Sequence, residues 1–274
     1  MLKLLKLIFM LAVAVFPLSP HRCLASNNNY NLNLKVFPTT FDYLKKTVLS
    51  PVHFTGADWK KAGMIAAGTG LLYSQDTAIR DFFQKSRTPD SNATARVFSH
   101  FGDGAVSTEI FLVLYAYGEI SHKNKFKRTG LLGAQSMLVT GIITGAVKLT
   151  LQRPLPCSGS SYDTWYDGKW NNIDDLAFPS GHTSSSFAFA TIIASEFADV
   201  KYVPVLAYAT ASLTALAMMN DNLHWASDIL PGAALGYFTA KKIEDLQKYD
   251  EAPNYTFLPI ISREGVSFLC SFSF

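Results

Sequence analysis

The sequence predicts an all-α protein, a bundle of helices followed by a short β-hairpin at the C-terminus. Hydrophobic residues make up 49% of the 274 residues and charged residues only 16%, which is typical of a chain with a large buried core. Apolar segments rich in Ala, Leu and Met recur along the chain, and this composition favours helices over strands. The last nine residues instead alternate, mostly apolar against polar, which is strand periodicity.

Residues 1–25 have the features of a secretory signal peptide. Lys3 and Lys6 precede ten apolar residues, Leu7–Phe16, and Cys23-Leu24-Ala25 provides a small-x-small cleavage site. Ten residues are too few to span the ~30 Å hydrocarbon layer, so we expect cleavage after Ala25 and export to a bacterial cell envelope. An uncleaved membrane anchor is the alternative. Beyond residue 25 the chain has 21 basic and 21 acidic residues, and this balance argues against a nucleic-acid partner.

The remaining chain divides into three parts. Residues 26–58 form a polar N-terminal extension, residues 59–245 the helical bundle, and residues 246–274 a tail. In the tail, Tyr255–Ile261 and the alternating last residues form the expected hairpin around Arg263-Glu264-Gly265. Cys157 and Cys270 remain after export, and both a disulfide and two free thiols are open to them. The segments expected as helices are Ala62–Gln75, Ala105–Ile120, Thr129–Val147, Thr183–Ser195, Tyr202–Asn220 and Ile229–Ala240.

Two of these segments are long enough to raise the question of a membrane. Thr129–Val147 and Tyr202–Asn220 are uncharged runs of 19 residues, but both are diluted with small residues. Small residues allow close helix packing in lipid and in a soluble bundle alike. We therefore expect a compact bundle on the periplasmic side of the inner membrane, with partial embedding in the membrane as the alternative.

Three short motifs carry candidate chemistry. Arg153-Pro154 ends the apolar segment from Thr129, because a residue before proline is pushed out of the helical region. Further along, Phe178-Pro179-Ser180-Gly181-His182 forms a tight turn directly before a helix. Backbone N–H groups at such a helix start, together with the Ser180 hydroxyl, form an anion site. The plainer interpretations are an ordinary helix end and an ordinary helix cap.

The third motif is His224-Trp225-Ala226-Ser227-Asp228. A His and an Asp four residues apart share one helical face, so Asp228 can fix the tautomer of the His224 imidazole and raise its basicity. A nucleophilic or general-base histidine requires this support. A structural pair and a metal-ligand pair are the alternatives. No Gly-x-Ser-x-Gly, His-Glu-x-x-His or Cys-x-x-Cys occurs, which disfavours a serine or zinc hydrolase.

The order and spacing of these motifs resemble the type 2 phosphatidic acid phosphatase / vanadium haloperoxidase superfamily. The pattern of that superfamily is Lys-x6-Arg-Pro, Pro-Ser-Gly-His and Ser-Arg-x5-His-x3-Asp. The resemblance covers about residues 146–229 in motifs and about residues 59–240 in helix layout. It implies a helical bundle with the active site between its helices.

The resemblance also implies roles for individual residues. His224 would be the nucleophile that takes the phosphoryl group, Asp228 would orient it, and His182 would protonate the leaving oxygen. The phosphoryl oxygens would be held by Arg153, Ser180 and the N–H of Gly181. Neither a metal nor another cofactor would be needed.

Two positions depart from the pattern of the superfamily. Ala146 stands where the lysine is expected, and Lys148 is the nearest lysine; it can replace that lysine as a phosphate ligand only if the helix unwinds before Pro154. Met218 stands where the second arginine is expected, and by resemblance its side chain would face the phosphate pocket or its edge. The alternative is that Met218 is a core residue. Asn220, four residues before His224, would offer only a neutral hydrogen bond.

The sequence therefore predicts a metal-independent phosphatase that acts on a phosphate monoester or lipid phosphate through a phosphohistidine, weakened by the loss of two basic ligands. The alternative is a non-catalytic, phosphatase-like envelope protein that binds phosphate or serves as a scaffold. A haloperoxidase is a third option. The loop at 155–178 carries aromatic residues that either line a mouth for a lipid or isoprenoid tail or form a small folded cluster: Tyr162, Trp165, Tyr166 and Trp170.

Overall fold

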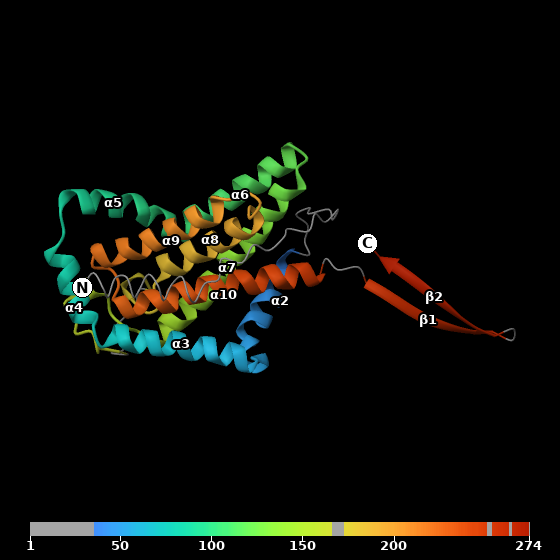
Figure 1. Cartoon of the computed structure of the whole chain (residues 1–274), viewed down its shortest axis with the longest axis horizontal. Coiled ribbons are helices and arrows are strands. Elements are labelled where there is room, and N and C mark those ends of the chain that lie inside the picture. The colour runs from blue at the N-terminus through green and yellow to red at the C-terminus, as the bar shows by residue number, and fades with distance from the viewer. Residues whose placement is uncertain (1–35, 166–172, 251–253, 263–264, 274) are drawn as a thin grey trace.

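The computed structural model of the chain describes residues 36–165, 173–250, 254–262 and 265–273. Short 3-10 turns, η2 (His100–Gly102) and η4 (Ile173–Asp175), lie beside the longer helices. Strands β1 (Asn254–Ser262) and β2 (Gly265–Ser273) form an antiparallel pair (Figure 1). The α-helices are α2 (Val36–Val48), α3 (Gly56–Tyr73), α4 (Asp76–Lys85), α5 (Pro89–Ser99), α6 (Gly104–Ile120), α7 (Asn124–Leu151), α8 (Gly181–Glu196), α9 (Val203–Asn220) and α10 (Ala226–Asp250).

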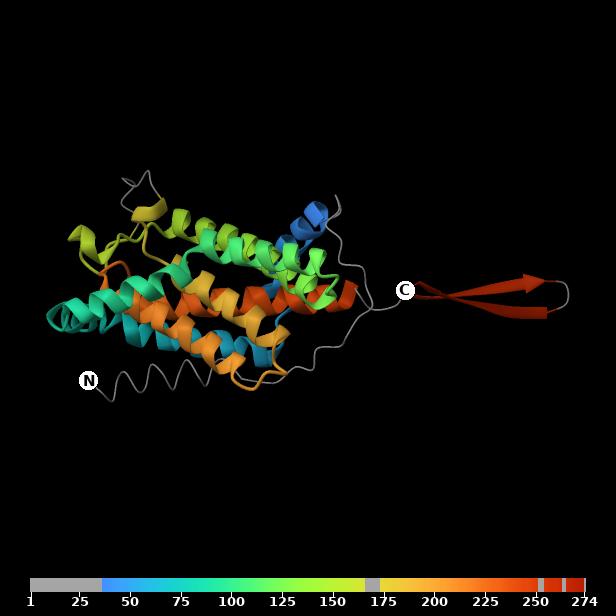
Figure 2. The same cartoon turned by 90° about the horizontal axis from the view of Figure 1, so that it is seen from above.

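Helix α8 lies at the centre of the bundle, with α7, α9 and α10 packed around it (Figure 2). Its small and apolar residues are buried on all sides. The contact between α8 and α10 is so close that two positions must be glycine. A Cβ atom on Gly232 would lie 2.7 Å from the carbonyl oxygen of Ser180, and one on Gly236 would lie 2.0 Å from that of Ser184. This packing fixes the start of α8 against the first turns of α10.

The predicted all-α bundle is confirmed, and each of the six predicted helical segments overlaps an observed helix. Helices α2, α4 and α5 are additional, because their sequences lack the long apolar runs used for the prediction. Local signals for α5 are nevertheless present. Thr88 and Ser91 form a reciprocal capping box, and Pro89 occupies the first turn, which are typical features of a helix start.

Helix α2 belongs to the segment predicted as an N-terminal extension. Tyr43 of α2 is buried in a core cluster with residues of α7, α8 and α10, and Gln135 of α7 donates a hydrogen bond of 2.9 Å to Thr40. The helices of the bundle also extend beyond the predicted limits of residues 59 and 245, from Gly56 to Asp250. Part of the segment before residue 59 thus contributes to the core.

In the part of the chain that the structure describes, two helices are long and apolar enough to cross a membrane, α7 and α9. Helices α5 and α6 meet the same criterion only as a pair, which is bent by 57° at η2. Large apolar side chains are exposed on these helices, including Val113 on α6, Leu138 on α7 and Leu206 on α9. These exposed faces favour membrane association of the bundle.

Some predictions concern residues that the structure does not describe. The signal peptide and its cleavage site, and the hairpin residues Arg263 and Glu264, lie outside the described residues. The observed strands β1 and β2 occupy the segments predicted to pair. Cys157 is exposed and is a free thiol.

Candidate active site

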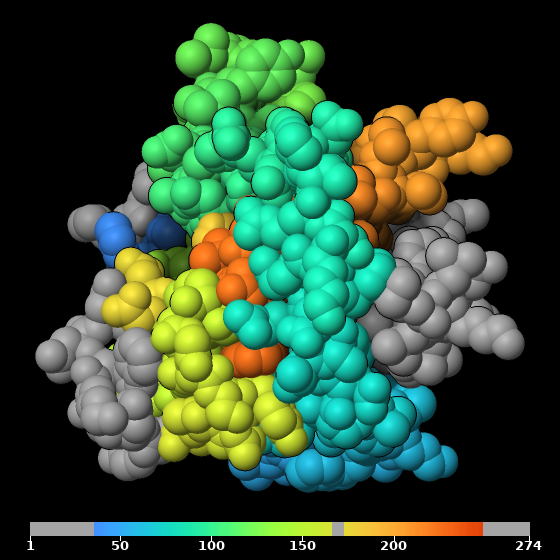
Figure 3. All heavy atoms as spheres, turned by 90° about the vertical axis from the view of Figure 1, so that its left-hand side faces the viewer, coloured from blue at the N-terminus to red at the C-terminus, as the bar shows by residue number. Residues whose placement is uncertain are grey.

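A cavity of about 460 Å³ lies at the end of the bundle where α7 and α9 finish and where α8 and α10 begin. Figure 3 looks onto this end, where orange atoms of the α9–α10 region are visible between the teal α5–α6 region and the yellow-green segment after α7. The cavity lining includes residues of the η2–α6 junction, α7, the loop after α7, α8 and the α9–α10 turn. Its ionisable residues are Asp103, Lys148, Asp174, His182 and His224.

Lys148 reaches this cavity from the last turns of α7. The helix ends at Leu151, and Gln152 adopts a left-handed conformation with φ of 47°, so the chain unwinds before Pro154. The buried Lys148 lines the cavity, and its Nζ donates a hydrogen bond to the carbonyl oxygen of Leu176. Ala146, at the position expected for lysine, is exposed instead. Lys148, and not residue 146, thus lies at the cavity.

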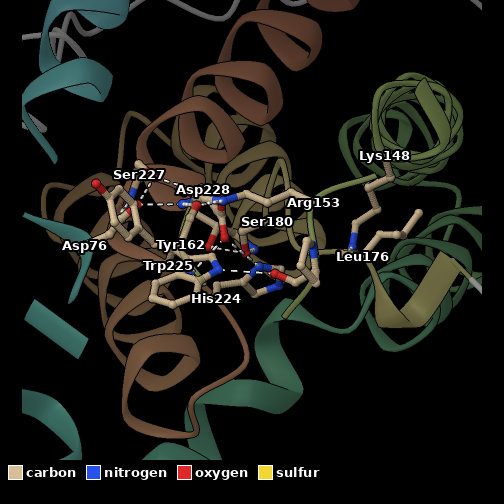
Figure 4. Close-up of polar contacts among 12 residues, drawn as sticks. Asp76, Lys148, Arg153, Tyr162, Leu176, Ser180, His224, Trp225, Ser227 and Asp228 are labelled. Carbon is tan, nitrogen blue, oxygen red and sulfur yellow. Dashed lines mark hydrogen bonds and ion pairs between the residues drawn. The ribbon is translucent and has the colours of Figure 1, made fainter. Parts of the chain in front are cut away.

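Arg153 is fully buried behind the cavity and does not line it. Its Nη1 donates to Asp228 at 2.5 Å and to Ser227 at 2.7 Å, and its Nη2 donates to Asp76 at 2.7 Å. The carbonyl oxygen of Tyr162 accepts from both Nε and Nη2 (Figure 4). A direct contact between Arg153 and a phosphate would require one of these hydrogen bonds to open.

Asp76 is the partner of Arg153 that the motifs do not contain. It is fully buried in the first turn of α4. Its Oδ1 accepts from the backbone N–H of Ser227 at 2.9 Å, and its Oδ2 accepts from the Ser227 hydroxyl at 2.5 Å. Burial raises the pKa of Asp76, although Ser227 and Arg153 oppose this shift. In the sequence, an Asp at a helix start indicates only a favourable interaction with the helix dipole.

Asp228 connects Arg153 to His224. Its Oδ2 accepts from the backbone N–H of Trp225 at 2.8 Å, and the same oxygen lies 3.6 Å from Nδ1 of His224. Nδ1 is buried, and because Asp228 is 3.6 Å away, Nδ1 has no hydrogen-bond partner among the described residues. His224 lines the cavity. Because its Nδ1 faces Asp228, Nε2 is the ring nitrogen that is available to a group bound in the cavity.

Burial lowers the pKa of His224, and the neighbouring carboxylate of Asp228 offsets this shift only in part. The imidazole is therefore neutral near pH 7, which leaves a lone pair on one ring nitrogen. Burial also lowers the pKa of His182, and the nearby His224 and Lys148 act in the same direction, whereas Asp103 and Asp174 oppose it. The two histidines share one cavity in their neutral forms.

Ser180 and Gly181 form the start of α8. The hydroxyl oxygen of Ser180 accepts from the backbone N–H of Thr183 at 3.3 Å, so Ser180 caps the helix. Its own N–H donates to the carbonyl oxygen of Asp228 at 3.1 Å. Ser180 is fully buried behind the cavity wall, whereas Gly181 and His182 line the cavity. The helix thus presents its N-terminal end, with its partial positive charge, to the cavity.

Hydrogen bonds to main-chain carbonyl oxygens connect the segments that carry the motifs. The indole nitrogen of Trp225 donates to the carbonyl oxygen of Pro154 at 3.1 Å, and the N–H of Ala177 donates to the carbonyl oxygen of Arg153. Pro154 and Leu176 form an isolated β-bridge. Segments that are far apart in the sequence are therefore held together around Arg153.

Met218 does not face the cavity, and the expectation that it lies at the phosphate pocket is wrong. Its side chain is fully buried in a hydrophobic cluster with Leu72, Ile79 and Ile229, among others. Asn220 also points elsewhere, because its side-chain amide donates to Asn92 and Asp221. The position six residues before His224 is thus part of the hydrophobic core.

The structure describes part of the aromatic loop. Tyr162 and Trp165 pack with Tyr73, and the guanidinium carbon of Arg153 lies 4.9 Å from the centre of the Trp165 ring. These two aromatic residues form a folded cluster around Arg153 and do not line the cavity. Tyr166 and Trp170 lie outside the described residues. Among the described residues, no group of three or more His, Cys, Asp or Glu side chains comes together to hold a metal.

The comparisons with known proteins concern the family and the fold. Residues 130–246, which contain all three motifs, match the family model of the PAP2 superfamily. This segment is a PAP2 domain. The solved structure of a transmembrane PAP2-type phosphatidylglycerolphosphate phosphatase from Bacillus subtilis shares the fold, with a TM-score of 0.51 and 18% identity. The alignment covers 79% of this chain and 96% of that structure.

Two further proteins are similar over parts of the chain. A lipid A 1-phosphatase from Porphyromonas gingivalis is 43% identical over 61 residues, which is 22% of this chain and 14% of that protein. The structure of Aquifex aeolicus LpxE has a TM-score of 0.45 at 20% identity, covering 62% of this chain and 94% of that structure. The match thus spans about one seventh of the length of the Porphyromonas protein.

Proposed function

We propose that this chain is a metal-independent phosphatase that removes the phosphate group from a membrane lipid. The observation that supports this proposal best is the meeting of Lys148, His182, His224 and the N-terminal end of α8 at one cavity. Two neutral histidines, one of them close to a buried carboxylate, are suited to phosphoryl transfer through the enzyme. The names of the relatives and the exposed apolar helices favour a lipid phosphate as the substrate class.

The first half-reaction transfers the phosphoryl group to His224. The lone pair on Nε2 of His224 attacks phosphorus, and the bond between phosphorus and the ester oxygen breaks. His182, which takes up a proton from solvent when the phosphate dianion binds, gives that proton to the leaving oxygen, so the lipid leaves as an alcohol. A bound phosphate dianion raises the pKa of a neighbouring imidazole, and this effect opposes the influence of burial on His182. Asp228 stabilises the positive charge that develops on the His224 ring.

The second half-reaction hydrolyses the phosphohistidine. His182, now neutral, takes a proton from water as the water oxygen attacks phosphorus, and the bond between phosphorus and Nε2 breaks. His182 releases this proton to solvent as inorganic phosphate leaves, and both histidines return to their neutral starting states. Lys148 and the N-terminal end of α8 stabilise the charge on the phosphoryl oxygens in both steps. Arg153 has a positioning role here, because its hydrogen bonds hold Asp228 and Ser227 in place.

The proposed orientation places the cavity on the outer side of the membrane. Lys123 and Lys201 lie in the α6–α7 and α8–α9 turns, and Lys125 lies in the first turn of α7, at the opposite end of these antiparallel helices from the cavity. Loops rich in lysine and arginine are retained on the cytoplasmic side. This orientation agrees with export directed by the predicted signal peptide.

The alternative, a phosphate-binding protein without turnover, is favoured by one feature. Lys148 is the single Lys or Arg among the described residues that line the cavity, because Arg153 is paired with Asp76 and Asp228 and Met218 is part of the core. A single cation leaves much of the phosphate charge uncompensated. This alternative predicts binding of inorganic phosphate without release of phosphate from any ester.

Phosphate release from phosphatidic acid, measured in detergent with excess chelator, tests the proposal. We expect wild-type activity to persist and His224→Ala to abolish it, whereas the exposed His53→Ala variant serves as a matched control. Brief incubation with radiolabelled substrate should label the wild type through an acid-labile, base-stable phosphohistidine. Strict dependence on a divalent metal, or full activity of His224→Ala, would contradict the proposal.

A further inference from the structure

We infer that a groove between α8 and α9 binds an acyl chain of the lipid whose phosphate occupies the cavity, an inference that rests on the proposed function. The groove has a volume of about 200 Å³. Its lining is apolar except for two hydroxyl residues: Phe101, Ser186, Phe189, Ile193, Val203, Leu206, Ala207, Thr210 and Ala211. The hydroxyl of Ser186 already donates to the carbonyl oxygen of Thr183 at 3.0 Å, so it adds little polarity to the surface.

The groove begins directly beside the phosphate cavity. On η2, Phe101 lines the groove and the next residue, Gly102, lines the cavity. On α8, Ser185 lines the cavity and the next residue, Ser186, lines the groove. On each of these two segments, neighbouring residues line the groove and the cavity, so the groove and the cavity are adjacent. A lipid with its phosphate beside His182 would bring its glycerol or sugar region to this junction.

The groove also runs in the direction that an acyl chain must take. Helix α8 leads away from the cavity, and its groove residues Ser186, Phe189 and Ile193 follow one another at helical spacing on one face. With a rise of 1.5 Å per residue, this stripe extends about 10 Å along the bundle. Helix α9 supplies the opposite wall, from Val203 to Ala211.

The side of the groove formed by α9 faces the region where acyl chains are found. Helix α9 is long and apolar enough to cross a membrane, and Leu206 in the groove wall is 64% exposed. The neighbouring wall residues Ala207, Thr210 and Ala211 are small, which leaves space beside Leu206. A lipid in the surrounding membrane can therefore insert a chain sideways without leaving the apolar environment.

The test fills the groove with a larger side chain and compares the activity on a whole lipid with the activity on its head group alone. Ala207 is half-buried and lines the groove, whereas Ala209 is exposed on the same helix and does not. We expect Ala207→Trp to lower kcat/KM for dioleoyl phosphatidic acid about tenfold and to leave that for glycerol 3-phosphate unchanged. Ala209→Trp, the matched control, should change neither value. Ala207→Leu provides a smaller filling if the tryptophan variant does not fold.

An equal loss on both substrates, or no loss on either, would overturn the inference. If the wild type releases phosphate from neither substrate, the proposed function fails, and binding of dioleoyl phosphatidic acid decides the question. If the groove binds an acyl chain, the wild type and Ala209→Trp will bind this lipid, and Ala207→Trp will bind it about tenfold more weakly. Absence of binding by the wild type would rule out the groove as an acyl-chain site.

Discussion

The carboxylate of Asp76 accepts a hydrogen bond of 2.7 Å from Nη2 of Arg153, although the two residues are 77 positions apart in the sequence. The opposite side of the same guanidinium contacts Asp228. Arg153 is thus held between two buried carboxylates, one from α4 and one from α10. Through Asp228 this arrangement also sets the position of His224, so α4 contributes to the site without reaching the cavity.

Replacing Asp76 should therefore damage both stability and activity. Asp76→Ala leaves Arg153 with a single carboxylate and removes the acceptor for two hydrogen bonds from Ser227. Breaking a buried ion pair from one side costs about 3–5 kcal/mol. We expect a clear fall in melting temperature and loss of phosphate release, measured beside the exposed Asp90→Ala as control. A variant that melts like the wild type would show that the pair contributes little.

The cavity should depend on Lys148 for its charge. Lys148→Met keeps much of the side-chain volume but removes the positive charge, so we expect weaker binding of vanadate and a loss of about 10²–10³ in kcat/KM. The exposed Lys85→Met variant is the control. If vanadate binding were unchanged in Lys148→Met, this lysine would not be a phosphate ligand.

The position of the lysine along α7 can be tested separately. Moving it in the double variant Ala146→Lys, Lys148→Ala restores the spacing of the superfamily pattern. Because residue 146 is exposed and residue 148 lines the cavity, we expect the double variant to bind vanadate no better than Lys148→Ala alone. Recovery of binding would mean that α7 changes its register when anions bind.

The stability of the protein should decrease in mild acid because of His224. Its pKa in the folded protein is lowered by burial from an ordinary value of 6.5. As the pH falls below 6.5, the unfolded chain takes up a proton that the folded protein resists, so the free energy of unfolding falls. Thermal melts between pH 7.5 and pH 5 should show a smaller loss of melting temperature for His224→Gln than for the wild type. Equal losses would contradict this assignment.

Met218→Arg tests whether position 218 is part of the core. The side chain is surrounded by apolar residues, so an arginine there would bury an unpaired guanidinium, which is strongly destabilising. We expect Met218→Arg to be unfolded or to melt at a much lower temperature, and Met218→Leu to remain close to the wild type. A folded Met218→Arg with tighter vanadate binding would instead place this position at the cavity.

Much of the fold follows from apolar runs and small-residue content, which predict the six helical segments that overlap α3 and α6–α10. The motifs also place Lys148, Gly181, His182 and His224, which do line one cavity. The role of Asp76 could not be predicted, because its partner Arg153 is far away in the sequence and a lone Asp at a helix start has many uses. The expectation that Met218 faces the phosphate pocket rests on its distance in sequence from His224. That distance does not determine where the side chain points, because the chain turns between the two residues.

The β-bridge between Pro154 and Leu176 has a consequence for the segment that it closes. The two ends of this loop are held by main-chain contacts and by Arg153, so its base keeps its shape whatever residues lie between. The entropy of closing a loop changes only slowly with its length. The part of this loop beyond Tyr162, whose carbonyl oxygen is held by Arg153, can therefore be exchanged or lengthened during evolution, which would alter what approaches the cavity while the histidines behind it stay where they are.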